Sequence, residues 1–186
     1  ENHKYYKQAF GLSKKLVVNG FSVISGGNSG IMEGTAKGAV AGSPNEKNPQ
    51  LFGVGVEQMP HLPSSPYATL NPFIKNFSVL MPHLFSRKVL LTRGTAGIIA
   101  FPGGVGTLDE FFEAIQLKQT KRMSQKPIVL IGKDHWQPLL DYFENHLLKN
   151  HFIAEKDCKL FVIMDDTDEI VDYLMKETNL TDPARS

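Results

Sequence analysis

Apolar residues follow two different spacings along the chain. Near the start they lie three or four residues apart, at Tyr5, Ala9, Leu12 and Leu16. This spacing predicts one face of a helix that ends near Asn19-Gly20. Similar spacing predicts further helices over 31–41, 84–92, 107–121, 136–149 and 167–176, and short apolar runs predict strands over 21–25, 51–56, 73–80, 96–101, 127–131 and 160–164.

Helices and strands alternate in this pattern, and the strands are continuous apolar runs. Such runs are typical of parallel strands that are covered on both faces. The sequence therefore predicts an α/β fold, a Rossmann-like doubly wound and mainly parallel sheet with helices on both faces. The chain has 186 residues, about one domain's length, so we expect a single domain over 1–186. Ligands of this fold bind at the carboxyl ends of the strands.

Two of the predicted strands run directly into glycine-rich loops, at 26–30 and at 102–107. A strand, a glycine-rich turn and a helix together present free backbone N–H groups to an anion, most often a phosphate. The alternative is that the glycines only make tight turns, but two such loops favour the phosphate hypothesis. The candidate binding residues are Gly26, Gly27, Gly30, Gly103, Gly104, Gly106 and Thr107.

Glu110 lies in the first turn of the predicted helix 107–121, beside the second glycine loop. The apolar stripe expected to be buried is Leu108, Phe111, Phe112 and Ile115, so Glu110 points elsewhere. One interpretation is that Asp109, Glu110 and Glu113 only complement the helix dipole. A carboxylate beside a phosphate site is better explained by chemistry on an uncharged sugar. Upstream, Arg87-Lys88 is the basic counterpart, or else a solvated helical pair.

Composition excludes several other classes of function. Twenty basic and 19 acidic residues give a net charge of +1, so we expect no nucleic-acid partner. No apolar run has the roughly 20 residues that a membrane span needs. The six histidines show no metal-ligand spacing, so we expect no catalytic metal and no cofactor. A single cysteine, Cys158, favours a reducing compartment and therefore a cytoplasmic location.

Three segments together resemble the LOG ("Lonely guy") family. Residues 102–110, PGGVGTLDE, match the family's PGGxGTxxE signature, and Arg87-Lys88 matches its upstream Arg-Lys pair. Residues 25–33, SGGNSGIME, resemble its first glycine loop, which Lys37-Gly38-Ala39 follows as in the family. The resemblance covers nearly the whole chain. It departs at Asn28 and Ser29, where the family usually has Gly and Pro, and at Ala36, and these departures bear on substrate preference.

The resemblance implies a Rossmann-like homodimer or larger homo-oligomer that hydrolyses the N-glycosidic bond of nucleoside 5′-monophosphates. Cytokinin riboside 5′-monophosphates and AMP are the family's substrates, and free base and ribose 5-phosphate are its products. Many members carry the label "lysine decarboxylase-like". Decarboxylation needs pyridoxal phosphate or another electron sink, and nothing in the chain suggests a Schiff-base lysine. The family also begins with a central strand and a Gly-Ser turn, so we expect the natural protein to be longer at its N-terminus.

The resemblance and the chemistry together assign roles to these residues. Glu110 would stabilise an oxocarbenium-like transition state or activate water, and the loop of Gly103, Gly104, Gly106 and Thr107 would anchor the phosphate. Arg87, with Lys88, would bind the phosphate or stabilise the departing base, and both roles stay open. Gly26, Gly27, Gly30 and Met32 would line the opposite wall, and the loop 59–71 would reach the site from either subunit. The alternative function is a non-catalytic nucleotide or molybdenum-cofactor carrier.

Overall fold

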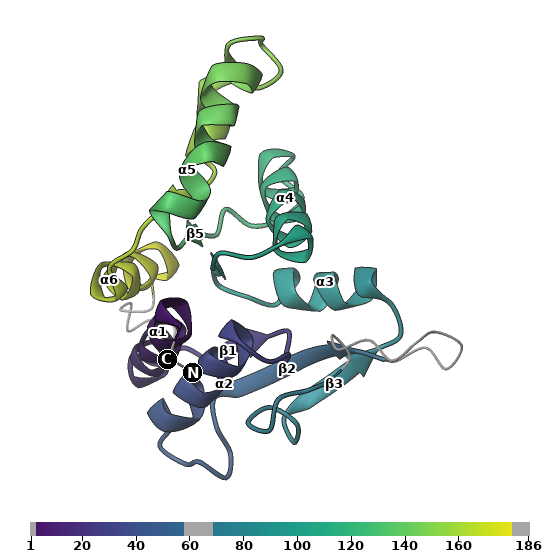
Figure 1. Cartoon of the computed structure of the whole chain (residues 1–186), viewed down its shortest axis with the longest axis vertical. Helices are drawn as coiled ribbons and strands as arrows, with labels where there is room; N and C mark the ends of the chain where they lie inside the picture. The colour runs from purple at the N-terminus through teal and green to yellow at the C-terminus, as the bar shows by residue number, and fades with distance from the viewer. Residues whose placement is uncertain (1–2, 58–68, 180–186) are drawn as a thin grey trace. The chain divides into compact units, whose positions relative to one another are not determined.

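The computed structural model describes residues 3–57 and 69–179 of the chain (Figure 1). These residues group into two compact units, Glu1–Thr95 and Ala96–Ser186, and each unit is described by itself. Both are α/β structures in which parallel strands alternate with helices, so the predicted Rossmann-like fold class is confirmed. The expectation of a single domain over 1–186 stays a prediction. No helix of the described residues is long and apolar enough to cross a membrane.

The first unit holds a three-stranded parallel sheet in the order β1-β2-β3. Val23 pairs with Leu51 and Gly53 with Ser78. Its elements are α1 (Lys4–Val18), β1 (Val23–Ser25), α2 (Ile31–Gly42), β2 (Leu51–Val56), β3 (Ser78–Met81) and α3 (Leu84–Arg93).

Helices α1 and α2 pack side by side through glycines (Figure 1). Three glycines of α2, each four residues after the last, lie against backbone carbonyl oxygens of α1 that are also four residues apart. An added Cβ would meet the carbonyl of Tyr6 at 2.8 Å from Gly34, that of Lys14 at 2.6 Å from Gly42, and that of Phe10 from Gly38. No side chain fits at such distances, so these glycines permit the close approach of the two helices.

The predicted strand over 73–80 is wrong in its first half. Residues 72–76 form turns, in which Ile74 N–H donates to the Asn71 carbonyl at 3.3 Å and Phe77 N–H to the Ile74 carbonyl at 2.8 Å. The apolar residues there signal burial instead of extended backbone, because Ile74 is fully buried in the core. Asn71-Pro72 is a turn-forming dipeptide, and β3 begins only at Ser78.

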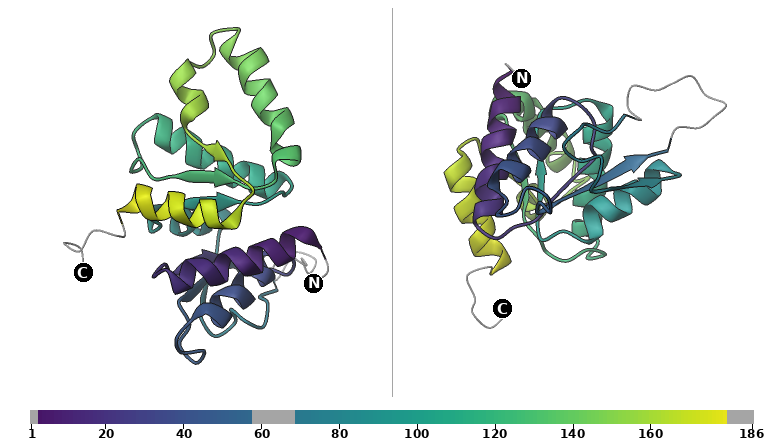
Figure 2. Two further views of the ribbon diagram at one scale, coloured as in Figure 1. Left: turned by 90° about the vertical axis from the view of Figure 1, so that its left-hand side faces the viewer. Right: turned by 90° about the horizontal axis from the view of Figure 1, so that it is seen from below.

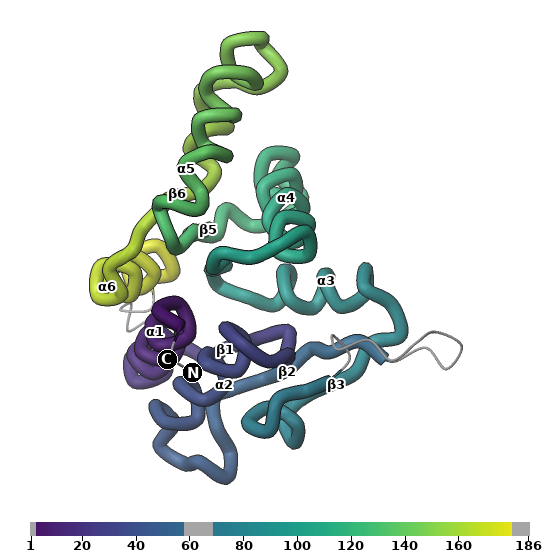
Figure 3. Tube along the Cα trace, viewed as in Figure 1, coloured from purple at the N-terminus to yellow at the C-terminus, as the bar shows by residue number. Residues whose placement is uncertain are grey.

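The second unit holds another three-stranded parallel sheet, in the order β4-β5-β6. The chain runs out along α5 and continues into a π-helix, η2, before it returns towards β6 (Figure 3). The elements of this unit are β4 (Ile98–Ala100), α4 (Val105–Gln119), β5 (Ile128–Leu130), α5 (Lys133–Tyr142), η2 (Phe143–Leu148), the 3-10 helix η3 (Glu155–Lys159), β6 (Val162–Ile163) and α6 (Thr167–Thr178).

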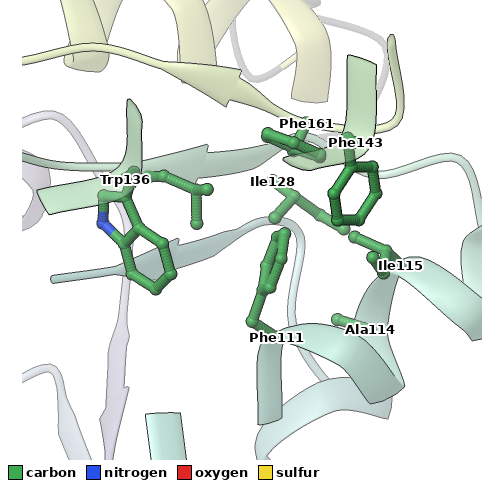
Figure 4. Packing of buried hydrophobic residues seen from close by; sticks show 8 residues of the cluster. Phe111, Ala114, Ile115, Ile128, Trp136, Phe143 and Phe161 are labelled. Atoms are coloured by element: carbon green, nitrogen blue, oxygen red, sulfur yellow. The ribbon is translucent and has the colours of Figure 1, made fainter. Parts of the chain in front are cut away.

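Aromatic side chains form the core on one face of this second sheet (Figure 4). The ring of Phe111 packs edge-on against that of Phe161, with centroids 5.2 Å apart, and also contacts the Trp136 ring at 5.7 Å. Helix α6 lies on the side of the strands away from α5 (Figure 2), where its Leu174 packs against Gly97. The second sheet is therefore covered on both faces, as its apolar strands predict.

Helix α4 differs from its prediction in its start and its buried face. It begins at Val105 instead of Thr107, so Glu110 lies in the second turn and the first turn holds no acidic residue. Phe112 is 41% exposed, whereas Phe111 and Ala114 are buried. Adjacent helical residues point about 100° apart, so Phe111 and Phe112 cannot share one buried face.

Helix α5 begins three residues before its prediction and changes form in its second half. Gly132, with a φ of 100°, lets the chain turn directly into the helix. Pro138 lies inside α5, where it offers no N–H to the helical ladder. The backbone changes from α-helix to π-helix at Phe143, five residues later, so the predicted helix over 136–149 is two different helices.

The contact between α1 and α2 is tested by a matched pair of glycine substitutions. Gly38→Ala would force its methyl group into the backbone of α1 at Phe10, and overpacking of this kind costs typically 1–3 kcal/mol. Gly11→Ala, inside α1, meets nothing within 4 Å and gains up to about 1 kcal/mol of helix propensity. Urea denaturation should show a lower midpoint for Gly38→Ala and an equal or higher one for Gly11→Ala. Equal midpoints for both variants would contradict the close packing.

Candidate functional site

Three helices of the second unit follow its three parallel strands, and they differ at their N-termini. At the start of α5, the Asp165 carboxylate accepts hydrogen bonds from Gly132 N–H at 2.6 Å and from Lys133 N–H at 3.3 Å. At the start of α6, Asp166 accepts from the N–H groups of the second and third residues after it, at 2.8 and 3.1 Å. Two of the three helix starts are therefore occupied by carboxylates of the chain itself.

Helix α4 starts differently, with a glycine cap and no acidic residue in its first turn. Its N-cap is Gly104, which has no capping side chain, and the residues from Gly104 to Gly106 are exposed. The first backbone N–H groups of a helix have no partner within the helix, and the helix dipole favours an anion there. Among the described helix starts of the second unit, the start of α4 therefore has the features that favour an anion: an exposed glycine cap and no acidic residue in the first turn.

The glycines of this loop have two different functions. An added Cβ at Gly103 would overlap the hydroxyl oxygen of Thr107, so Gly103 makes room for that side chain. Gly104 and Gly106 have nothing within 4 Å of an added Cβ. The Thr107 hydroxyl therefore lies against the loop, while the backbone at Gly104 and Gly106 stays open to a ligand.

Glu110 lies on the same side of α4 as the open end of the loop. It follows Gly106 by four residues and Thr107 by three, and residues at these spacings are neighbours on a helix surface. The rise from Thr107 to Glu110 is about 4.5 Å along the axis. Glu110 is half-buried, whereas Asp109 is exposed, so the two adjacent carboxylates point in different directions.

In the first unit, the structure brings Arg87 to the first glycine loop. An added Cβ at Gly26 would overlap a terminal nitrogen, Nη2, of the Arg87 guanidinium and would lie 3.0 Å from the Met32 sulfur. Gly26 therefore makes room for Arg87, a reason for glycine that its place in a phosphate-like loop does not reveal. Gly27 and Gly30 have φ angles of 84° and 75°, which favour glycine.

The Arg87 side chain is hydrogen-bonded to the first sheet. Its Nε–H donates to the Val54 carbonyl of β2 at 2.9 Å, and the residue is half-buried. This bond fixes the plane of the guanidinium, because Nε belongs to that plane. Lys88, the next residue of α3, is also half-buried.

Asn71 is a residue of the first loop's surroundings that the sequence analysis missed. Its side-chain amide donates to the carbonyls of Gly27 at 2.9 Å and Asn28 at 3.1 Å. Its backbone N–H also donates to the Gly27 carbonyl, at 2.7 Å. Asparagine before proline signals only a turn, so no local pattern could reveal this contact across more than 40 residues. Residues 59–68 of the predicted loop 59–71 lie outside the described residues.

The predicted site residues divide between the two units. Arg87, Lys88, Met32 and the first glycine loop belong to the first unit, and Glu110 and the second glycine loop belong to the second. Among residues 3–57 and 69–179, no group of three or more metal-ligating side chains is arranged to hold a metal ion.

Cys158 does not have the features of a catalytic nucleophile. It lines a cavity of about 420 Å³ in the second unit, together with Lys133, Gln137 and Glu144. Burial raises the pKa of the Cys158 thiol, and the nearby carboxylate of Glu144 raises it further. A raised pKa lowers the fraction of thiolate, which is the nucleophilic form.

Comparison with known proteins identifies relatives along almost the whole chain. A family profile described as "Possible lysine decarboxylase" matches residues 32–174. A pyrimidine/purine nucleotide 5′-monophosphate nucleosidase of Escherichia coli K12 is 26% identical over 190 residues, which cover 99% of this chain and 40% of that protein. A cytokinin riboside 5′-monophosphate phosphoribohydrolase of Rhodococcoides fascians is 25% identical, over 87% of this chain and 77% of that protein.

A probable cytokinin riboside 5′-monophosphate phosphoribohydrolase of Oryza sativa subsp. japonica is 29% identical, over 83% of this chain and 64% of that protein. The chain spans about two fifths of the length of the Escherichia coli relative. The matched profile covers well over half of the chain and includes both the Arg87-Lys88 pair and the second glycine loop. The chain therefore belongs to the LOG family, to which the profile named for a possible lysine decarboxylase corresponds.

Proposed function

We propose that this protein is a nucleoside 5′-monophosphate phosphoribohydrolase. In the proposed reaction, one water molecule cleaves the N-glycosidic bond, and the products are the free base and ribose 5-phosphate. The observation that carries the proposal is the open start of α4 with Glu110 on the same side of the helix. The names of the relatives from Escherichia coli and Rhodococcoides fascians support the same reaction class.

The phosphate of the nucleotide would bind at the start of α4. Backbone N–H groups from Gly104 to Thr107 and the Thr107 hydroxyl would donate to its oxygens, and the helix dipole would add a favourable potential. The Asp165 and Asp166 carboxylates already occupy the starts of α5 and α6. They would repel a phosphate there, so the α4 position is the favoured one at this edge of the second sheet.

Glu110 would act on the ribose. Departure of the base leaves positive charge on the anomeric carbon and the ring oxygen, and a nearby carboxylate stabilises that charge or takes a proton from the attacking water. Half-burial of Glu110 strengthens either effect, since the local dielectric is lower than that of water. The phosphate anchor would hold the ribose in place and so supply binding energy for the reaction.

Arg87 is proposed as the cationic contact of the nucleotide. The bond from its Nε to Val54 and its position against Gly26 give the guanidinium a fixed orientation. It would either pair with the phosphate or stabilise the departing base, with Lys88 beside it. Lysine at position 87 could not reproduce both contacts, because an ammonium group lacks the planar arrangement of donors.

The first test is a panel of nucleoside 5′-monophosphates and the corresponding nucleosides, incubated with the intact protein. Free base should be released from at least one monophosphate and much more slowly from its nucleoside, because the nucleoside lacks the anchor. Chromatography of the base measures the release. Absence of release from every monophosphate would exclude the proposed hydrolase and favour a nucleotide carrier.

Substitution of the two adjacent carboxylates separates catalysis from helix electrostatics. Glu110→Gln keeps the shape of the side chain and removes its charge, so turnover should fall roughly a hundredfold or more. Nucleotide affinity should stay level or rise, because a negative charge near the phosphate is gone. Asp109→Asn should keep normal turnover. Steady-state kinetics with circular dichroism measures both, and the reverse pattern would show that the wrong face of α4 was assigned.

Gly106→Ala tests the phosphate position without disturbing the fold. The new methyl group meets nothing within 4 Å and adds up to about 1 kcal/mol of helix propensity. It also projects on the side of α4 that carries Glu110, where the substrate would lie. The thermal midpoint should therefore stay level or rise while KM for the nucleotide rises. Gly103→Ala is the control for internal packing, since it displaces Thr107 and should lower the thermal midpoint. An unchanged KM for Gly106→Ala would show that the substrate does not bind on that side of α4.

A further inference from the structure

Asn71 binds the first glycine loop from inside the first unit. The residue is only 4% exposed, and all three of its described bonds to the loop go to carbonyl oxygens. Its backbone and side-chain N–H groups donate to Gly27 at 2.7 and 2.9 Å, and its side-chain amide also donates to Asn28 at 3.1 Å. Two successive peptide groups of the loop are therefore oriented by one asparagine.

The orientation of these carbonyls fixes the direction of two backbone donors. In a trans peptide the C=O and the following N–H point in opposite directions within one plane, and the described chain holds no cis peptide. With the carbonyls of Gly27 and Asn28 turned towards Asn71, the N–H groups of Asn28 and Ser29 point away from it. Asn28 is half-buried and Ser29 exposed, so these donors lie at the more open side of the loop.

The same loop carries the contact with Arg87. Gly26, which lies against the guanidinium, directly precedes the two residues whose carbonyls Asn71 binds. Leu70, the neighbour of Asn71, packs against Gly27, where an added Cβ would lie 2.6 Å from its Cδ2. A loop held at Gly27 from one side cannot move without changing the position of Gly26 against Arg87.

We propose that Asn71 is a positioning residue, which aims the N–H groups of Asn28 and Ser29 at oxygen atoms of the bound nucleotide. This inference rests on the proposed function and on the expectation that the first glycine loop lines one wall of the nucleotide site. Asn71 itself does not touch the nucleotide. The resembled family usually has proline at the position of Ser29, and proline has no N–H, so the Ser29 donor is a feature of this chain's own sequence.

Two variants at position 71 test the proposal. Asn71→Ala removes the side-chain donors, and Asn71→Asp keeps the shape but places a carboxylate against two carbonyls. In both variants the backbone N–H of residue 71 still donates to the Gly27 carbonyl, but the Asn28 carbonyl loses its side-chain donor, so the Ser29 N–H is no longer held in its direction. Loss of one hydrogen bond to a charged oxygen weakens binding roughly ten- to a hundredfold, so both variants should bind AMP that much more weakly in calorimetric titration. The control is Val17→Ala, a substitution in the core of the same unit that lies outside the loop. It should lower the urea midpoint and leave AMP affinity unchanged.

A double-mutant cycle with Ser29→Pro distinguishes positioning from general stabilisation. Ser29→Pro removes one proposed donor with a residue that the resembled family accommodates. If Asn71 acts through this donor, the loss of AMP affinity in the double variant should be clearly smaller than the two single losses multiplied. Losses that multiply fully, or an effect of Asn71→Ala no larger than that of Val17→Ala, would overturn the proposal.

The same measurements separate this inference from the proposed function. Wild-type protein that binds AMP but releases no base would overturn the hydrolase proposal, while weaker binding by Asn71→Ala would still support the positioning role. If the wild-type protein hydrolyses a nucleotide and Asn71→Ala hydrolyses it equally well, the positioning role alone is overturned. Wild-type protein that neither binds nor hydrolyses a nucleotide overturns both.

Discussion

Parallel pairing is the constraint on which each unit of this protein depends. Neighbouring strands can run in the same direction only if the chain crosses back between them, and here helices make most of these crossings. Each sheet therefore presents the carboxyl ends of its strands at one edge, and a helix starts close to that edge. The positions of both glycine loops follow from this arrangement, because each loop joins a strand end to a helix start.

Glycine in this chain meets three separate physical demands. Gly38 permits backbone contact between two helices, and Gly26 and Gly103 make room for the side chains of Arg87 and Thr107. Gly27 has a positive φ angle, which residues with a side chain rarely adopt. At Gly106, by contrast, an added Cβ would meet nothing within 4 Å. These demands have different consequences for substitution, although the sequence shows the same letter at every position.

The sequence predicts local features of the fold well and distant contacts poorly. The strand over 51–56 and the helix ending before Asn19 follow from hydrophobic spacing alone, since a buried strand and an amphipathic helix have distinct periods. Both glycine loops are recognisable as local clusters of glycine that directly follow predicted strands. Two contacts are not predictable from the sequence: the hydrogen bonds from Asn71 to the first glycine loop, and those from the start of α5 to the Asp165 carboxylate. In both, the partners lie more than 30 residues apart in the sequence, so no local pattern indicates them. Phe112 was misplaced because two adjacent phenylalanines give no indication of which one is buried.

The two aspartates at the starts of α5 and α6 bear on non-productive binding. A sheet edge with several open helix starts would attract a phosphorylated ligand to each of them, and a ligand held at the wrong start would block the right one. In the described second unit, Asp165 and Asp166 act as permanent internal competitors at two of three positions. Under the proposed function, these two carboxylates would repel a phosphorylated ligand from the starts of α5 and α6, and this repulsion would limit inhibition by excess substrate.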